Sequence, residues 1–177
     1  MIKIKQDMRA KTITLPTYDE LYDTAPQEIK DYIDKCVDTP QGTDWHPEGC
    51  VDIHNRLVYD RARATGDMNL AIAAFFHDLG KVDTTAPNKR GGWSAHGHER
   101  FSAKLVSKYN VWIKDLGADP NAVFEIVNNH MRVKQMDQMR KPKREALMQN
   151  KYYRELQKFT KFDDMRTLTD EEINRYK

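Results

Sequence analysis

Six residues of the types that bind transition metals share one property: helical periodicity turns each of them toward the protein interior. A ligand must point at the same interior region as the apolar residues that hold its helix in place. Four of the six are histidines and two are aspartates, and they come from separate parts of the chain. The pattern predicts a metal site assembled from several helices, with the ligands His54, His77, Asp78, His98, His130 and Asp163.

Helical spacing places four of these ligands on apolar stripes. Two nearby candidates, His96 and Asp164, share their faces with polar residues, which favours His98 and Asp163 over them. The expected stripes are Leu57, Val58 and Arg61 with His54; Phe101, Leu105 and Tyr109 after His98; Val123, Ile126 and Val127 before His130; and Leu156 and Phe159 before Asp163.

The adjacent pair His77 and Asp78 ends the most apolar segment of the chain, residues 68–79. This segment is predicted to be the buried central helix, with Asp67 capping its start and Gly80 its end. Neighbouring side chains on a helix diverge by about a quarter turn, so both can reach one ion only near a helix end. We expect Gly80 to provide that end.

A buried salt-bridge network is the alternative to a metal. A single inward histidine is usually a structural one, but an inward aspartate without a partner costs several kcal/mol. The sequence shows no inward stripe of Lys or Arg that would pair with both Asp78 and Asp163. Two aspartates together with four histidines therefore favour a metal.

Length and composition predict one all-α domain over residues 1–177, with about seven helices. Net charge is +2, and the longest apolar run, residues 70–76, is far shorter than the roughly 20 residues of a membrane span. The start of the chain lacks a signal-peptide core, so we expect a cytoplasmic protein without a membrane partner. Residues 1–16 are expected to form a short β-hairpin or an N-terminal arm.

Basic residues are concentrated between residues 130 and 144, where they outnumber the single acid Asp137. At the mouth of a metal cleft they would attract an anionic substrate and bind phosphate oxygens. An ordinary solvated loop is the alternative. Because no aromatic residues are interleaved with them, they are weak support for single-stranded nucleic acid. The cluster comprises Arg132, Lys134, Arg140, Lys141, Lys143 and Arg144.

The ligand order, together with three short segments, resembles the HD-domain superfamily of metal-dependent phosphohydrolases. Within it, the likeness over roughly residues 45–165 is to the HD region of bacterial tRNA nucleotidyltransferases. The nucleotidyltransferase Gly-Ser loop and paired-aspartate motif are missing, so we expect a stand-alone HD protein that does not add CCA. The segments are His46-Pro47-Glu48-Gly49, His77-Asp78-Leu79-Gly80-Lys81 and His96-Gly97-His98-Glu99.

The resemblance implies a compact helical HD bundle that binds one or two divalent ions. One ion would be held by His54, His77, Asp78 and Asp163, and Asp78 would bridge to a second ion on His98 and His130. Imidazole and carboxylate ligands favour Mn, Fe, Co, Ni or Zn over the all-oxygen sites of Mg or Ca.

The implied activity is hydrolysis of a phosphate mono- or diester in a nucleotide or short oligonucleotide, 2′,3′-cyclic phosphates included, by a metal-activated water on a centre that contains Asp78. Lys81 would bind the phosphate, unless it only complements the helix C-terminus. Arg132, Arg140 and Lys141 are further substrate-binding candidates. His46 and His96 would protonate the leaving oxygen or contact substrate.

Two other functions stay open at this point. Some HD proteins with the same six ligands hold two irons and activate oxygen. A non-catalytic nucleotide-binding module is the other alternative. The sequence leaves the oligomeric state undecided.

Overall fold

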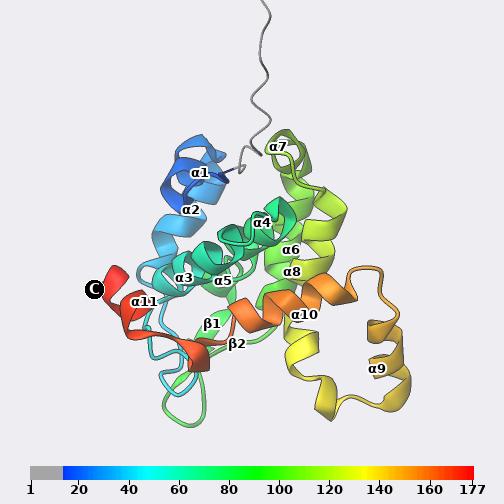
Figure 1. Cartoon of the computed structure of the whole chain (residues 1–177). Coiled ribbons are helices and arrows are strands. Elements are labelled where there is room, and N and C mark those ends of the chain that lie inside the picture. Colours follow the sequence, from blue (N-terminus) through cyan, green and yellow to red (C-terminus); the bar gives the residue numbers. More distant parts are fainter. Residues whose placement is uncertain (1–13) are drawn as a thin grey trace, which may run out of the picture.

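The structure is a computed structural model, and it describes residues 14–177. The expected N-terminal hairpin or arm lies almost wholly outside these residues. The described chain is mainly helical, with one two-stranded sheet, so the expected all-α class is confirmed (Figure 1). Its longer elements are α2 (Gln27–Cys36), α3 (Val51–Arg63), α4 (Met68–Phe76), α6 (His98–Lys108), α8 (Pro120–Lys134), α9 (Lys141–Met148) and α10 (Tyr153–Phe162).

Shorter elements complete the described part and raise its number of α-helices to eleven, above the expected seven. Several of them are only one or two turns long. They are α1 (Tyr18–Thr24), α5 (Lys81–Thr84), α7 (Asn110–Asp115), α11 (Asp170–Arg175), the 3-10 helices η1 (Met136–Gln138) and η2 (Met165–Thr167), and the strands β1 (Thr85–Pro87) and β2 (Trp93–Ala95).

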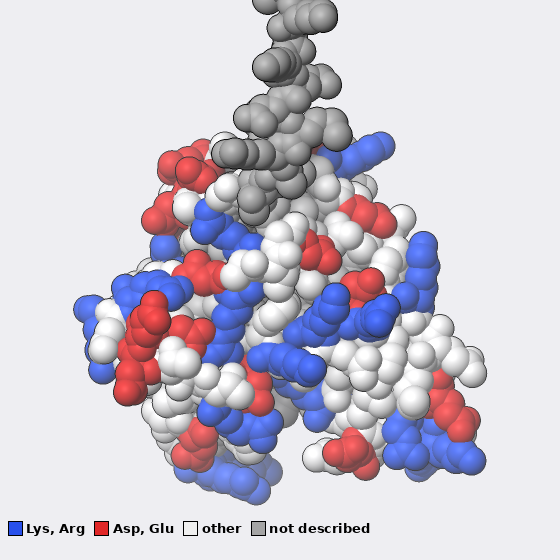
Figure 2. All heavy atoms as spheres, viewed as in Figure 1, with Lys and Arg blue, Asp and Glu red and all other residues white. Residues whose placement is uncertain are grey.

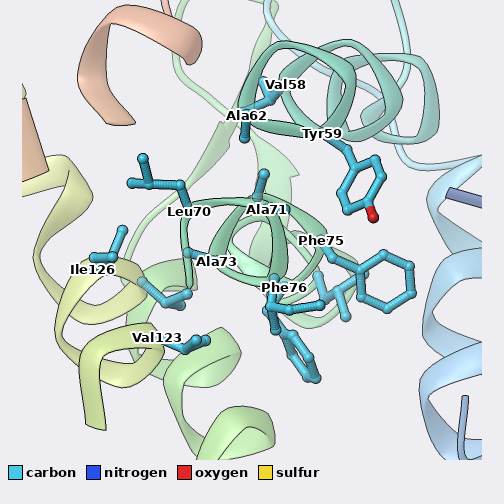
Figure 3. Close-up of a cluster of buried hydrophobic side chains, with 14 of the residues drawn as sticks. Val58, Tyr59, Ala62, Leu70, Ala71, Ala73, Phe75, Phe76, Val123 and Ile126 are labelled. Carbon is cyan, nitrogen blue, oxygen red and sulfur yellow. The ribbon is translucent and has the colours of Figure 1, made fainter. Parts of the chain in front are cut away.

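Helix α4 is the central helix of the bundle, as predicted. Its residues 70–76 are all at most 1% exposed. Figure 3 shows α4 between α3, which contributes Val58 and Tyr59, and α8, which contributes Val123 and Ile126. Asp67 caps the helix as expected, because its carboxylate accepts a hydrogen bond from the Leu70 amide at 3.2 Å.

The end of α4 differs from the prediction. The helix stops at Phe76, and residues 77–80 form a tight turn before α5. Gly80 is not a left-handed cap, since its φ is −63°. Glycine is needed here for another reason: a Cβ at Gly80 would lie 2.2 Å from the His98 carbonyl oxygen. The Gly80 amide also donates to Ser102 Oγ at 2.8 Å, so the turn packs directly on α6.

Three of the four predicted stripes are buried or half-buried, and the stripe on α6 is partly wrong. Phe101 is 41% exposed. The buried face of α6 instead runs from His98 through Ser102 to Leu105 and Val106. After His98, the buried position is thus Ser102, one residue later in the sequence than the predicted Phe101. The i+3 position therefore faces water, whereas the i+4 position packs against the turn at Gly80.

The sequence also did not predict the β1–β2 hairpin, which pairs Thr85 with Ala95 and Pro87 with Trp93. Strands of three residues are too short to show a period of two. Gly97, with φ of +78°, turns the chain from β2 into α6 and so delivers His98 to the interior. Within residues 14–177, no helix has both the length and the apolar composition needed to cross a membrane.

Candidate metal centre

The fold brings the six predicted ligands together, and all six side chains are buried. They form two groups. Within each group, the candidate ligand atoms all lie within 4.8 Å of one another. The first group is His54, His77 and Asp163, from α3, the turn after α4 and the end of α10. The second is Asp78, His98 and His130, from the same turn, the start of α6 and α8.

Hydrogen bonds to the backbone fix the orientation of three imidazole rings. In each, Nδ1 lies against a carbonyl oxygen three residues earlier. A carbonyl oxygen can only accept, so Nδ1 carries the hydrogen and a neutral ring turns its Nε2 lone pair toward the centre. The pairs are His77 with Ala74 at 2.8 Å, His98 with Ala95 at 2.7 Å and His130 with Val127 at 2.6 Å.

The ring nitrogens are placed as two ligands of one ion would be. Nε2 of His98 lies 3.3 Å from Nε2 of His130, and Nε2 of His54 lies 3.2 Å from Nε2 of His77. Two nitrogens bound to one ion, each at about 2.0–2.1 Å, lie roughly 3 Å apart. Between His98 and His130, two lone pairs face each other when both rings are neutral. A cation resolves that repulsion.

Asp78 connects the two groups because its carboxylate oxygens face different ones. Oδ1 lies 3.0 Å from His98 Nε2 and 3.7 Å from His130 Nε2. Oδ2 lies 3.3 Å from His54 Nε2 and 3.4 Å from His77 Nε2. This arrangement suits a carboxylate that bridges two ions.

Each buried aspartate also has a lysine partner, contrary to the expectation from sequence. Lys81 Nζ lies 2.7 Å from Asp78 Oδ2 and donates to Gln41 Oε1 at 2.7 Å. Lys134 Nζ contacts Asp163 Oδ2. The buried carboxylates alone are therefore explained by ion pairs. Ion pairs do not explain why four imidazole nitrogens converge. This convergence is therefore the stronger indication of a metal.

Electrostatics keep this donor set ready for a cation. Burial opposes charge on Asp78 and Asp163, but nearby histidines and the two lysines outweigh it and hold the pKa of both carboxyls well below the usual range. Burial lowers the pKa of His130 to about 4, so its ring is neutral near pH 7. The pocket thus combines ionised carboxylates with a neutral imidazole.

Glu48 orients a predicted ligand, and sequence analysis gave it no role. Its Oε1 accepts hydrogen bonds from Nδ1 of His54 at 2.7 Å and from Nδ1 of His46 at 2.9 Å. Its side chain is only 1% exposed. The signal in the sequence was a carboxylate between two histidines, just before the helix that carries one of them. A carboxylate behind a ligating imidazole fixes the ring and raises its basicity.

Arg61 secures the position of Asp163. One of its nitrogens, Nη1, donates to the carbonyls of Phe162 at 3.0 Å and Asp164 at 3.1 Å, on either side of the ligand. The guanidinium also pairs with both oxygens of Glu172, at 2.6 and 2.9 Å. The sequence placed Arg61 on the His54 face, but its reach to α10 and α11 required the tertiary structure.

Both groups reach a cleft of about 790 Å³, because Asp78, His98 and Asp163 line it. His46, Lys81 and the exposed His96 line this cleft, so the three predicted catalytic residues outside the ligand set lie around it. Of the basic residues at 130–144, Lys134 lines it. Arg132, Arg140 and Lys141 are exposed elsewhere, and α9 projects from the bundle (Figure 1). Figure 2 shows basic side chains around the hollow in the lower middle of this face.

A family model described as the HD domain matches residues 51–163, more than half of the chain. The chain belongs to the HD domain family. This family comprises metal-dependent phosphohydrolases. The resemblance to HD-domain proteins that the sequence motifs indicated is therefore confirmed. The match starts at the first residue of α3 and ends at Asp163, so it contains all six candidate ligands.

The HD chain is similar to proteins named multifunctional CCA protein. It is 44% identical over 78 residues to the one from Dechloromonas aromatica (strain RCB), covering 43% of this chain and 18% of that protein. It is 37% identical over 92 residues to the one from Janthinobacterium sp. (strain Marseille), covering 51% and 21%. The chain thus spans about a fifth of these relatives. No solved structure gives a significant match.

Proposed function

We propose that this HD protein is a metal-dependent phosphohydrolase that cleaves a phosphate mono- or diester of a nucleotide or short oligonucleotide, 2′,3′-cyclic phosphates included. The observation that carries the proposal is the pair of candidate ligand groups connected by Asp78, with Asp78, His98 and Asp163 lining a cleft. We propose His54, His77 and Asp163 as ligands of one ion and His98 and His130 as ligands of a second, with Asp78 between them.

The donor set suits Mn, Fe, Co, Ni or Zn better than Mg. A divalent ion bound there would act as a Lewis acid toward a phosphoryl oxygen and lower the pKa of a bound water. The protein contributes the fixed arrangement: three histidines are held by backbone carbonyls, and the fourth by Glu48. Little rearrangement is then needed to receive the ion.

Two lysines support phosphate as the substrate group. Lys81 is 8% exposed and lies beside Asp78. Lys134 lies beside Asp163. Each ammonium lies next to a ligand carboxylate and lines the cleft, where it would bind phosphoryl oxygens as charge develops on them. The placement of Lys81 supports substrate binding over a role limited to the helix C-terminus.

The two remaining histidines suit different tasks. Burial lowers the pKa of His46, and its Nδ1 is bonded to Glu48, so it fits a positioning role behind His54. His96 is exposed at the cleft. It is the better candidate to protonate the leaving oxygen. A His96→Gln variant that keeps its metal but loses activity mainly toward substrates with poor leaving groups would support this assignment.

The test of the proposed function is release of phosphate, nucleoside or ring-opened product from mono-, tri-, cyclic and dinucleotides. The native chain is loaded in turn with Mn, Fe, Co, Ni, Zn or Mg. We expect release with at least one transition metal. No release from any substrate, together with substrate-dependent oxygen uptake by the iron-loaded protein, would contradict hydrolysis and indicate oxygen chemistry.

A further inference from the structure

Two tryptophans, Trp45 and Trp93, line the same cleft as Asp78, His98 and Asp163. Trp45 is 71% exposed and Trp93 is 42% exposed, so both belong to the small set of large apolar side chains that are exposed in the described chain. An exposed indole contributes little to a core, and burying it against a ligand is favourable. Both residues also lie in segments that position the metal centre.

Trp45 lies in the loop before His46, and Trp93 begins β2, which leads through Ala95 to His98. The two segments touch, since a Cβ built on Gly42 would lie 3.7 Å from the Trp93 carbonyl oxygen. The two segments that bring Trp45 and Trp93 to the cleft are thus neighbours in the fold. Residues that line the cleft from other segments include Lys134, from α8, and Arg166, from η2.

The size of the cleft leaves room beyond a phosphoryl group. A cleft of about 790 Å³ lies in the range of sites that hold a whole small molecule. With the phosphate near Lys81 and Asp78, the rest of the substrate must extend along the cleft. The exposed indoles of Trp45 and Trp93 in this cleft suit a flat, weakly polar group. Nucleobases stack on indole rings with little dependence on which base it is.

Resting on the proposed function, we propose that Trp45 and Trp93 form a nucleobase-stacking subsite, so that the substrate is recognised by its base as well as its phosphate. The chemical class is a nucleotide, or the terminal nucleotide of a single strand, in contrast to a sugar phosphate. Because stacking has little base selectivity, the subsite accepts purines and pyrimidines. Purines, with the larger ring area, bind more tightly.

A binding experiment tests the subsite without turnover. The chain has three tryptophans, and the third, Trp112, packs with its ring centroid 6.1 Å from those of Phe75 and Phe76. Metal-loaded Trp112→Phe protein is titrated with a non-hydrolysable adenosine phosphonate and with the matching ribose phosphonate. We expect saturable quenching of tryptophan fluorescence by the adenosine compound alone. Its absence would overturn the subsite.

The matched variant is the double substitution Trp45→Leu and Trp93→Leu, which keeps only Trp112 as a reporter. We expect its fluorescence to be unaffected by the adenosine phosphonate. Metal content and circular dichroism equal to those of the native chain show that the variant folds. Quenching that persists in this double variant would place the base near Trp112 and overturn the proposal.

A kinetic comparison separates this inference from the proposed function. With a nucleotide substrate, each Trp→Leu change is expected to lower kcat/KM by about 5- to 150-fold, the effect of stacking one base on an aromatic ring. With the base-free sugar phosphate, kcat/KM should stay within about twofold. Equal losses on both substrates, or no loss on either, would overturn the stacking role while hydrolysis stands.

If the native chain hydrolyses no ester, the proposed function fails, but the fluorescence titration still decides the subsite. Quenching that requires Trp45 and Trp93 would then support a base-binding site in a protein that does not hydrolyse these esters. Absence of quenching would overturn the subsite as well, by a measurement that does not depend on turnover.

Discussion

The four candidate histidine ligands all direct Nε2 toward the centre, and each has a separate acceptor behind Nδ1. For His54 that acceptor is a buried carboxylate, Glu48, at 2.7 Å. Three backbone carbonyls serve the other rings. At the scale of single residues, the site is thus prepared by hydrogen bonds that select one tautomer before any ion is bound.

Glu48→Gln is expected to weaken metal affinity by about tenfold, because it removes the charge behind His54 while keeping side-chain size. The measurement is a competitive metal titration against a chromogenic chelator. Glu145→Gln, on the exposed side of α9, is the control and should bind metal like the native chain. Equal affinity of the Glu48 variant and the control would show that Glu48 does not orient a ligand.

The sequence predicted that these six side chains face the interior, mainly because the helices that carry or precede them have apolar faces, and all six are buried. It missed the lysine on each aspartate for physical reasons. Lys134 is four residues after His130, on the same helical face, but its long side chain reaches a carboxylate on another helix. Lys81 follows a turn, where helical periodicity no longer applies. A long flexible side chain can form an ion pair with a residue on another element, and residue spacing along one helix does not predict such a pair.

At the scale of elements, the turn between α4 and α5 sets the distance between the two ligand groups. It carries His77 and Asp78, and Gly80 lets it approach the first turn of α6, which carries His98. A residue with a side chain at Gly80 would displace one element from the other. The spacing of the two ligand groups therefore depends on a position that is not itself a candidate ligand.

Gly80→Ala should lower the free energy of unfolding by about 1–3 kcal/mol through overpacking and reduce metal binding. Metal content after dialysis and thermal unfolding check both effects. Gly42→Ala is the control, because a Cβ there meets its nearest atom at 3.7 Å, an ordinary contact. Native metal content in the Gly80 variant would contradict the packing argument.

Helix α11 is attached to α3 by an ion pair with a defined pH dependence. The hydrogen bond from Arg61 lowers the pKa of Glu172 to about 2. Because the folded pKa lies below the unfolded value of about 4.3, the pair stabilises the fold fully above that pH. This stabilisation is lost as the pH falls toward 2.

Glu172→Gln is expected to lower the free energy of unfolding by about 1.5–3 kcal/mol at pH 7, with the difference shrinking below pH 4. Urea unfolding from pH 7 to pH 3 measures it. Glu171→Gln, at an exposed neighbouring position, serves as the control. A difference that stays constant across this range would mean that the Glu172 carboxylate is not responsible.

The sequence predicted the long helices well and the short elements poorly. Residues 70–76 form one continuous apolar run, so a buried helix was the expected result. Phe101 was assigned to the interior, but the close contact at Gly80 rotates the buried face of α6 toward Ser102. The β1–β2 hairpin has too few residues for a pattern and is defined by the pairing of its two strands with each other.

At the scale of the whole molecule, the cleft gathers residues from distant segments. Gln41 and Lys81 meet on one side, while Lys134 and Asp163 meet on another. The basic residues Arg132, Arg140 and Lys141 lie elsewhere, although sequence proximity to His130 suggested a common surface. Helix α8 ends at Lys134, and η1 leads the chain away, which no local pattern indicates.

Metal bound among α3, α6, α8 and α10 should stabilise the whole bundle, because ligands from all four helices meet only in the folded state. At about 100 times Kd, an ion adds about 2.7 kcal/mol. We expect a chelator to lower Tm by about 5–10 °C. Differential scanning calorimetry with and without the chelator measures this shift, and an unchanged Tm would contradict a shared metal centre.

Metal-dependent hydrolysis at Asp78 is tested most directly by comparing the metal-loaded native chain with Asp78→Asn in the release of product from the best nucleotide substrate. Asp115→Asn, at an exposed position on α7, is the control. We expect Asp78→Asn to lower metal content and to reduce kcat/KM by at least about a thousandfold, about 4 kcal/mol, while the control retains native activity. Native turnover in Asp78→Asn would show that the carboxylate shared by the two groups does not support the chemistry.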